Sequence, residues 1–219
     1  MGQALRIDFV ADVVCPFCWI GWARLKRALA GRPALDPDIV WRPFQLAPDL
    51  PPEGMDRKTY LEAKFAPGVL ADMQARILDM GKGDGLEFRF GAIERSPNTS
   101  RAHRVILWAA AEGQLDAAAD AMFAAYFRDG RDIGDAKVLA QIAHEAGLDA
   151  GEILRRLAAD LDAELIRAAH IGAVRAGVAG VPFYVFGERI GLSGAQEPAA
   201  LISALDRAAT LARPVAANG

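Results

Sequence analysis

Residues 12–21 read Asp-Val-Val-Cys-Pro-Phe-Cys-Trp-Ile-Gly, and they contain Cys15 and Cys18, the only two cysteines of the 219-residue chain. An apolar run over residues 5–14 comes before the pair and predicts a strand. Helical spacing of apolar residues over about 17–30 follows it. Two cysteines separated by two residues, where a strand passes into a helix, are typical of a redox-active dithiol.

The start of a helix is a favourable place for a thiolate. Its first backbone N–H groups have no partner within the helix, and the helix dipole adds partial positive charge there. Both effects stabilise a negative charge on Cys15, and Pro16 is tolerated at the first helical position because it has no N–H to lose. Cys18 follows one turn later, within reach of a disulfide. We therefore expect Cys15 to attack and Cys18 to resolve.

Two cysteines at this spacing can also serve a metal site, a structural disulfide or simply the core. A structural zinc site takes about four ligands, whereas His103, His144 and His170 are far from the cysteines and from one another in sequence. We therefore expect no bound metal. A structural disulfide does not suit a cytoplasmic protein. A chance spacing of two core cysteines is the simplest remaining alternative, and the rest of the chain bears on it.

The composition indicates a folded domain rather than a disordered or membrane-spanning chain. Hydrophobic residues make up 53% and charged residues 24% of the sequence, which allows a sizeable core. The net charge of −3 gives no argument for binding nucleic acid or an anionic membrane. No apolar run is long enough to span a bilayer, and residues 1–6 lack the layout of a signal peptide. We expect a cytoplasmic protein, either a monomer or a homodimer.

Apolar periodicity divides the chain into two sheet-forming parts with helices between them. Strands are expected at 5–10 and 39–46, and Pro43 places the second one at a sheet edge. Residues 180–192 predict a strand and a hairpin, followed by a closing helix. The expected class is α/β, a thioredoxin-like fold with an inserted all-helical subdomain. Its three segments are 1–54, 55–178 and 179–219.

Val181-Pro182 is the second informative feature of the sequence. A proline that opens a strand after a C-x-x-C has a known use when its peptide bond is cis. The ring then packs against the reactive cysteines, and the backbone before it is free to pair with an extended substrate segment. We predict a cis bond at Pro182 and substrate binding at the Val181 backbone. An ordinary trans proline at a strand start is the alternative.

Four further residues are candidates for roles at the site. Asp12 precedes the cysteines, and an acid there can accept the proton of the second thiol. A cap or surface turn is the more common role of such an aspartate. Phe17, Trp19 and Trp22 lie close to the cysteines and would form an apolar groove for substrate, although aromatic residues more often simply pack in the core.

The motifs together resemble the DsbA family of thiol–disulfide oxidoreductases, most closely its cytoplasmic FrnE-like branch. The resemblance spans nearly the whole chain in order, over 12–21, Asn98-Thr99, Ala102-His103-Arg104, Gly177-Val178, 180–186 and Ser193-Gly194-Ala195-Gln196. It implies Cys15 as nucleophile, Cys18 as its partner and Pro182 as the cis-proline. Family members commonly have Trp where Phe17 stands and Tyr where Trp19 stands. The second cysteine pair of some members is absent, which excludes electron transfer through a second internal disulfide.

The dipeptide between the cysteines tunes the reduction potential. Periplasmic DsbA proteins resemble this chain but have Pro-His there, which strongly stabilises the thiolate. Phe17 can neither hydrogen-bond the sulfur nor supply charge. We therefore expect a less oxidising pair, which rests as a dithiol in the reducing cytosol and favours disulfide reduction or isomerisation.

Three functions follow from these features. The leading one is a thiol–disulfide oxidoreductase or isomerase that acts on protein disulfides or small-molecule thiols, requires no cofactor and uses glutathione at most as co-substrate. The second is a glutathione-dependent isomerase or transferase, because kappa-class glutathione transferases and 2-hydroxychromene-2-carboxylate isomerases are similar in layout. They typically have Ser at the active position, and Asn98 and His103 would then be the residues to test; a helix cap and a local hydrogen bond are the simpler roles of these two residues. The third is a redox-sensing or holdase module that binds partners through its aromatic residues.

Overall fold

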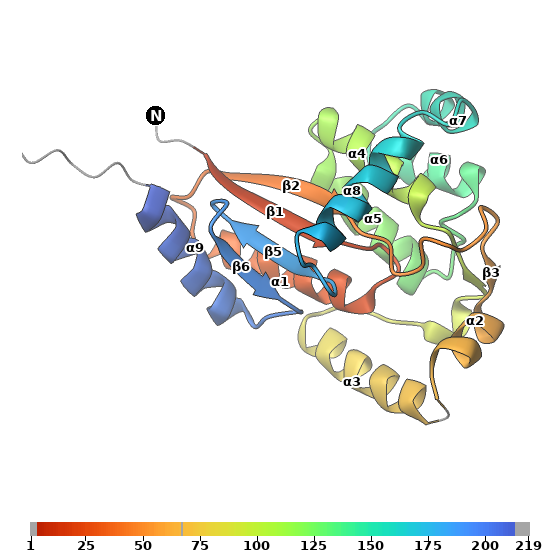
Figure 1. Ribbon diagram of the computed structural model, residues 1–219, viewed down its shortest axis with the longest axis horizontal. Coiled ribbons are helices and arrows are strands. Elements are labelled where there is room, and N and C mark those ends of the chain that lie inside the picture. Colours follow the sequence, from red (N-terminus) through yellow and green to blue (C-terminus); the bar gives the residue numbers. More distant parts are fainter. Residues whose placement is uncertain (1–3, 67, 213–219) are drawn as a thin grey trace, which may run out of the picture.

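A four-stranded mixed sheet forms the centre of the computed structural model, which describes residues 4–66 and 68–212 (Figure 1). The strand order is β2–β1–β5–β6. The strands are β1 (Leu5–Ala11), β2 (Pro37–Pro43), β5 (Phe183–Phe186) and β6 (Ile190–Ser193). β1 runs parallel to β2 and antiparallel to β5, and β6 pairs antiparallel to β5. β1 is therefore central, in agreement with its nearly continuous apolar sequence.

β2 lies at an edge of the sheet, which confirms the expectation from Pro43. The strand ends at Pro43 rather than at residue 46, the end that the apolar pattern predicts. The N–H of Phe44 still donates to the carbonyl of Ala11 on β1 at 3.0 Å, but the next two amides bond to side chains instead of to a neighbouring strand. The N–H of Gln45 donates to Nδ1 of His170 at 3.2 Å, and that of Leu46 donates to Oδ2 of Asp12 at 2.7 Å.

Two helices pack together against one face of the sheet. They are α1 (Pro16–Ala30), which begins directly after Cys15, and α9 (Pro198–Ala212), which also contacts β1 and β5. Two others contact β2, namely α4 (Ser100–Ala111) and α8 (Ala163–Arg175). Figure 1 shows α8 in front of the sheet and α1 behind it. The sheet is thus covered by helices, as expected for a thioredoxin-like fold.

The helical insertion separates β2 from β5 along the chain. Besides α4 and α8 it contains α2 (Arg57–Lys64), α3 (Val69–Gly83), α5 (Leu115–Phe127), α6 (Ala136–Glu145) and α7 (Ala150–Ala158). It is not entirely helical, because β3 (Met55–Asp56) and β4 (Arg95–Ser96) form a short antiparallel ribbon, and a 3-10 turn, η1, spans Phe90–Ala92. The prediction of a thioredoxin-like fold with a helical insertion is confirmed in this sense, and the segment boundaries stay predictions.

Aromatic rings join α1 to the insertion. Trp19 stacks on Phe127 with ring centroids 5.7 Å apart and meets Phe88 edge-on at 4.8 Å. On the other side of α1, Trp22 packs on Phe9 of the central strand at 5.3 Å. Such pairs add to the free energy gained by burying the rings. The helix that begins directly after Cys15 and carries Cys18 is therefore fixed against the sheet and against the insertion. No helix of the described residues is both long and apolar enough to cross a membrane.

Candidate active site

Cys15 and Cys18 lie one helical turn apart at the start of α1. Cys15 is the N-cap residue, and its carbonyl accepts hydrogen bonds from the N–H of Cys18 at 3.0 Å and of Trp19 at 3.3 Å. The Cys15 thiol is 4% exposed and donates to the carbonyl oxygen of Val181, with 3.6 Å between Sγ and O. The geometry joins the two sequence motifs, since a thiol from one meets the backbone of the other.

Cys18 differs from Cys15 in its surroundings. Its side chain is fully buried. Burial raises the pKa of the Cys18 thiol well above that of an ordinary cysteine, because a thiolate loses its hydration there, and the neighbouring Cys15 adds to the increase. Cys18 is therefore a neutral thiol near pH 7. It needs a proton acceptor before it can act as a nucleophile.

The peptide bond between Val181 and Pro182 is cis, as predicted. Pro182 is buried against α1 at Gly21, where an added Cβ would lie 2.9 Å from the ring Cγ. The same Cβ would overlap the hydroxyl of Tyr184. That hydroxyl is buried and has no hydrogen-bond partner. Position 21 therefore needs glycine, because the proline and the tyrosine approach the helix where a side chain would stand.

Asp12 belongs to a buried polar network rather than to a surface turn. Its side chain is fully buried, with Oδ2 accepting from the N–H of Leu46 and Oδ1 at 3.3 Å from Nε2 of His103. Nδ1 of His103 accepts from the indole N–H of Trp41 at 3.1 Å. Nε2 therefore holds the ring proton and faces both Asp12 and the carbonyl of Phe44, 3.1 Å away. The Trp41 indole thus fixes Nδ1 of His103 as the accepting ring nitrogen.

The sequence predicts a helix cap for Asn98 and a local hydrogen bond for His103, and the structure differs in how it treats the two. Asn98 does support the start of α4, because its Oδ1 accepts from the N–H of Ser100 at 3.0 Å. Its Nδ2 also donates to the carbonyl of Leu50 at 2.6 Å, which ties the loop after β2 to this helix. The expectation of a local hydrogen bond for His103 is wrong. Its partners lie directly after β1, on β2 and directly after β2, so it links the insertion to the sheet.

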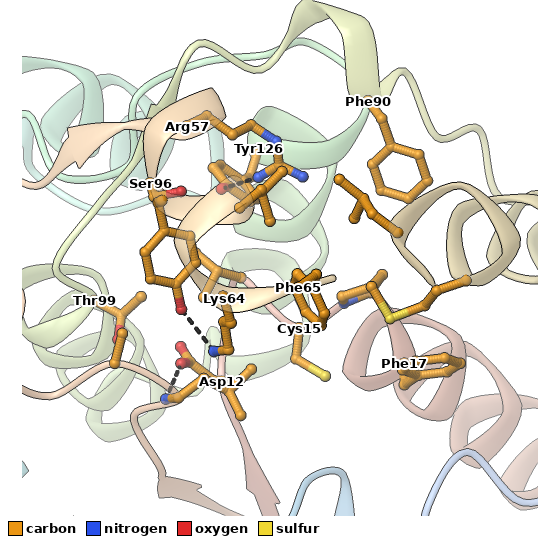
Figure 2. A pocket seen from close by; sticks show the side chains of 18 of the residues that line it. Asp12, Cys15, Phe17, Arg57, Lys64, Phe65, Phe90, Ser96, Thr99 and Tyr126 are labelled. Atoms are coloured by element: carbon orange, nitrogen blue, oxygen red, sulfur yellow. Dashed lines mark hydrogen bonds between the residues drawn. The ribbon is translucent and has the colours of Figure 1, made fainter. Parts of the chain in front are cut away.

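A cavity of about 290 Å³ opens beside Cys15, between the start of α1 and the helices α2 and α3. Figure 2 shows Asp12, Cys15 and Phe17 along one side of it, and Arg57, Ser96 and Tyr126 along the other. Val181 also lines it. The structure thus brings together Cys15, Phe17, Val181 and Asp12 of the predicted site residues. The carboxylate of Asp12 also lies close enough to Cys18 for its charge to contribute to the raised pKa of that thiol.

Trp19 and Trp22 lie in the core instead of on the cavity wall. Trp19 is 7% exposed and Trp22 is fully buried, and neither is among the residues that line the cavity. The indole N–H of Trp22 donates to Asp120 on α5, 2.9 Å away. Their packing is that of core residues, as the simpler alternative held. The prediction that they bind substrate receives no support from this geometry.

The sequence reasoning missed the far wall of the cavity. Four residues of α2 line it at the spacing of one helical face, namely Arg57, Tyr60, Leu61 and Lys64. Tyr126 of α5 joins them. The spacing of the four was visible in the sequence, although nothing there placed that face near Cys15. Among the described residues, no group of three or more His, Cys, Asp or Glu side chains is arranged to hold a metal ion.

Comparisons with known proteins show the family to which the chain is related. A family model described as "DSBA-like thioredoxin domain" matches residues 6–206. The uncharacterized protein YwbO of Bacillus subtilis (strain 168) is 27% identical over 192 residues, which cover 86% of this chain and 90% of YwbO. The crystal structure of the probable DsbA oxidoreductase SCO1869 from Streptomyces coelicolor is 31% identical, with a TM-score of 0.86. That match covers 96% of this chain and 92% of SCO1869.

Two more distant structures are similar in fold alone. A 2-hydroxychromene-2-carboxylate isomerase is 18% identical with a TM-score of 0.72, over 94% of this chain and 97% of that chain. The cytosolic disulfide reductase DsbM from Pseudomonas aeruginosa, determined with GSH, is 19% identical with a TM-score of 0.59. The match covers 94% of this chain and 96% of DsbM.

Proposed function

We propose that this chain, which belongs to the family of DsbA-like thioredoxin domains, is a thiol–disulfide oxidoreductase that works through Cys15 and Cys18. The observation that carries the proposal is the arrangement of the two thiols at the start of α1. Cys15 lines a cavity, whereas Cys18 is buried one turn behind it. One thiol is thus placed to meet a substrate, and the other to meet only the first thiol.

The reaction proceeds in two exchange steps. The thiolate of Cys15 attacks one sulfur of a substrate disulfide, the substrate S–S bond breaks, and one substrate thiol leaves with a proton. Cys18 then gives up its proton and attacks Sγ of Cys15, which releases the second substrate thiol and leaves a Cys15–Cys18 disulfide. The substrate gains two electrons, and the protein loses them. An external thiol such as glutathione returns the pair to the dithiol.

Asp12 is the candidate acceptor for the proton of Cys18. Asp12 is a buried carboxylate near that thiol, and its negative charge contributes to the raised pKa of Cys18. The N–H of Leu46 donates to Oδ2, whereas Oδ1 has no hydrogen-bond partner among the described residues and lies 3.3 Å from Nε2 of His103. A carboxylate fixed in this way can take up the proton as Cys18 attacks and return it afterwards. His103 acts as a positioning residue in this scheme, because it meets Asp12 and not the sulfur atoms.

Val181 and Phe17 are the substrate contacts that we propose beside the thiols. Both line the cavity, and the carbonyl of Val181 already accepts from Cys15. Phe17 offers an apolar surface without charge or hydrogen-bonding groups. We therefore propose a pair that is less oxidising than one with histidine at this position, and that favours reduction or isomerisation over net oxidation.

In more detail, we propose that the chain is a FrnE-like member of the family and acts in the cytoplasm. The sequence motifs support it, together with the likeness in fold to DsbM, which is named a cytosolic disulfide reductase. Glutathione is the small thiol that we propose as co-substrate, since DsbM was determined with GSH. In a cytosol kept reducing by glutathione, the pair would rest as a dithiol.

The test compares the wild type with Cys15→Ser and Cys18→Ser. Each reduced protein is mixed with glutathione disulfide and with insulin, and the products are separated by mass. We expect the wild type to reduce an equivalent amount of disulfide, Cys15→Ser to reduce none, and a mixed disulfide on Cys15 to accumulate in Cys18→Ser. Equilibrating the wild type in buffers of reduced and oxidised glutathione gives the reduction potential of the pair. Disulfide reduction that survives Cys15→Ser would refute the proposal.

A glutathione-dependent isomerase is the alternative, and the fold of 2-hydroxychromene-2-carboxylate isomerase is the observation in its favour. A resolving thiol has no role in such chemistry, which makes Cys18 the discriminating residue. Tight glutathione binding that Cys18→Ser leaves unchanged, without disulfide exchange in any variant, would favour the isomerase. Binding of unfolded partners that persists after alkylation of both thiols would favour the holdase.

A further inference from the structure

Two cations line the cavity beside Cys15, and the exchange chemistry does not use them. Arg57 and Lys64 lie on the same face of α2. Nη1 of Arg57 donates to the hydroxyl of Tyr126 at 2.8 Å, and Nζ of Lys64 donates to the hydroxyl of Tyr60 at 2.7 Å. Among the residues that the structure describes, neither cation has a carboxylate oxygen within 4.0 Å. Their positive charges are therefore not neutralised by the protein.

Arg57 is held in place rather than loose. Tyr126 is 1% exposed, and its hydroxyl donates in turn to the carbonyl of Arg95 at 3.2 Å. The guanidinium also lies near the Tyr126 ring, 5.8 Å from its centroid. Burial raises the pKa of Tyr126 to about 12, so the phenol stays neutral and offers no counter-charge. A guanidinium has five N–H donors, and those that Tyr126 leaves unused suit a carboxylate.

The remainder of the wall is mostly apolar. Half-buried side chains from α2, the following turn and α3 form it, together with one from η1, namely Leu61, Phe65, Leu70, Met73 and Phe90. The volume of about 290 Å³ is near the lower end for small-molecule pockets. Asp12 is the negative group in the cavity; its Oδ2 already accepts from the N–H of Leu46, and its Oδ1 lies 3.3 Å from Nε2 of His103. A matching occupant is small, with an apolar chain and an anionic end.

We propose that this cavity selects small disulfides whose short apolar chains end in carboxylates. One carboxylate binds Arg57 and Lys64, and the near sulfur meets Cys15. The inference rests on the proposed function and adds its substrate class. Cys15 bonds to the near sulfur as the substrate S–S bond breaks, and one carboxylate-bearing thiol leaves. Cys18 then displaces the second. The substrate is reduced by two electrons, and an external thiol reduces the protein pair again.

The experiment uses three symmetrical disulfides of similar size and different charge. These are dithiodipropionate, which is anionic, hydroxyethyl disulfide, which is neutral, and cystamine, which is cationic. The reduced protein is mixed with each at low salt, and every rate is divided by that of dithiothreitol with the same disulfide, which removes intrinsic reactivity. We expect dithiodipropionate to exceed hydroxyethyl disulfide by about tenfold, and cystamine to be the slowest. High salt should reduce the differences between the three relative rates, because it screens the charges.

Variants test whether the two cations cause the preference. Arg57→Gln combined with Lys64→Gln should bring the three relative rates to within about twofold of one another. Arg57→Lys keeps the charge and should retain most of the preference, which separates loss of charge from damage to the fold. Lys58→Gln is the matched control on the same helix. Its side chain lies 3.9 Å from Glu62, and it does not line the cavity.

The outcomes separate this inference from the function on which it rests. Equal relative rates in the wild type, or a preference that survives the double variant, would overturn the acidic substrate class and leave the oxidoreductase in place. Failure of the wild type to reduce any of the three disulfides would count against the oxidoreductase itself. Loss of preference in Lys58→Gln as well would show a general surface charge effect, which also overturns the assigned site.

Discussion

The helices around the cavity are packed differently. More than half of the residues of α5 are buried, namely Ala118, Ala119, Met122, Phe123, Ala125, Tyr126 and Phe127. α2 buries none of its residues, although it shares a cavity wall with Tyr126, and α3 buries only Ile77 and Gly81. Figure 1 places α2 and α3 at the margin of the molecule. The cavity is thus bordered by densely packed helices, α1 with α5, which we call the firm side, and by the half-exposed residues of α2 and α3.

Because of this difference, α1 and α5 hold the thiols in place, whereas α2 and α3 shape the cavity. Trp19 of α1 stacks on Phe127 of α5, so the helix that begins at the cysteine pair is held firmly. Segments with few buried apolar contacts open at a lower free energy than the core. α2 and α3 can therefore adjust to a substrate while Cys15 and Cys18 keep their positions. We expect substitutions on the firm side to affect stability, and those on the other side to affect substrate binding.

The largest loss of stability should come from removing a large buried side chain on the firm side. Phe123 is fully buried in the aromatic cluster, and Phe123→Ala should lower the free energy of unfolding by about 3–5 kcal/mol. Met73 of α3 is half-buried at the cavity, and Met73→Ala should lower it by about 1 kcal/mol and mainly raise the KM for substrate. Urea unfolding and steady-state kinetics measure the two quantities. Equal losses of stability would remove the contrast between the sides.

A smaller effect is expected where β5 meets α1. Gly21→Ala forces a methyl group against Pro182 and the Tyr184 hydroxyl, and should cost about 1–3 kcal/mol. Tyr184→Phe removes a buried hydroxyl that has no partner, so it should leave stability unchanged or slightly higher. The double variant should recover part of the loss, because one of the two clashing groups is gone. Strictly additive free energies would show that Tyr184 does not restrain position 21.

The smallest effect concerns pH and the second thiol. Burial raises the pKa of Cys18, so above about pH 8.5 the folded reduced protein keeps a proton that the unfolded chain has lost. The folded state then binds more protons, and the free energy of unfolding falls as pH rises, by at most about 1.4 kcal/mol per pH unit. Urea unfolding under reducing conditions, from about pH 8 to about pH 10, should show a shallower decline in Cys18→Ser. Parallel declines would contradict the buried thiol.

Much of the arrangement around Cys15 and Cys18 could be predicted from the sequence, because its features are local. Cys15, Pro16 and Cys18 follow a strand and open a helix within a few residues, so their mutual placement depends on backbone geometry alone. The edge position of β2 followed from Pro43 in the same way. The cis bond before Pro182 was predicted from two motifs far apart in sequence, since a known fold relates them.

The opposite wall and the buried network were not predictable in this way. Arg57 and Lys64 share a helical face that the sequence displays, but only the folding of the insertion places this face beside Cys15. His103 reaches Trp41 and Asp12 across the boundary between insertion and sheet. Trp19 and Trp22 were expected in a groove and lie in the core. Helical spacing indicates which residues share a face, and it does not indicate what that face meets.

The sequence by itself determined the candidate dithiol of this protein, and the tertiary structure decided its surroundings. Two cysteines at the start of a helix define a dithiol, because the spacing and the helix terminus act within one turn of backbone. The burial of Cys18, the network around Asp12 and the cationic wall at Arg57 depend on contacts between residues tens of positions apart. Such contacts form only when the insertion packs against the sheet, and no local pattern encodes them.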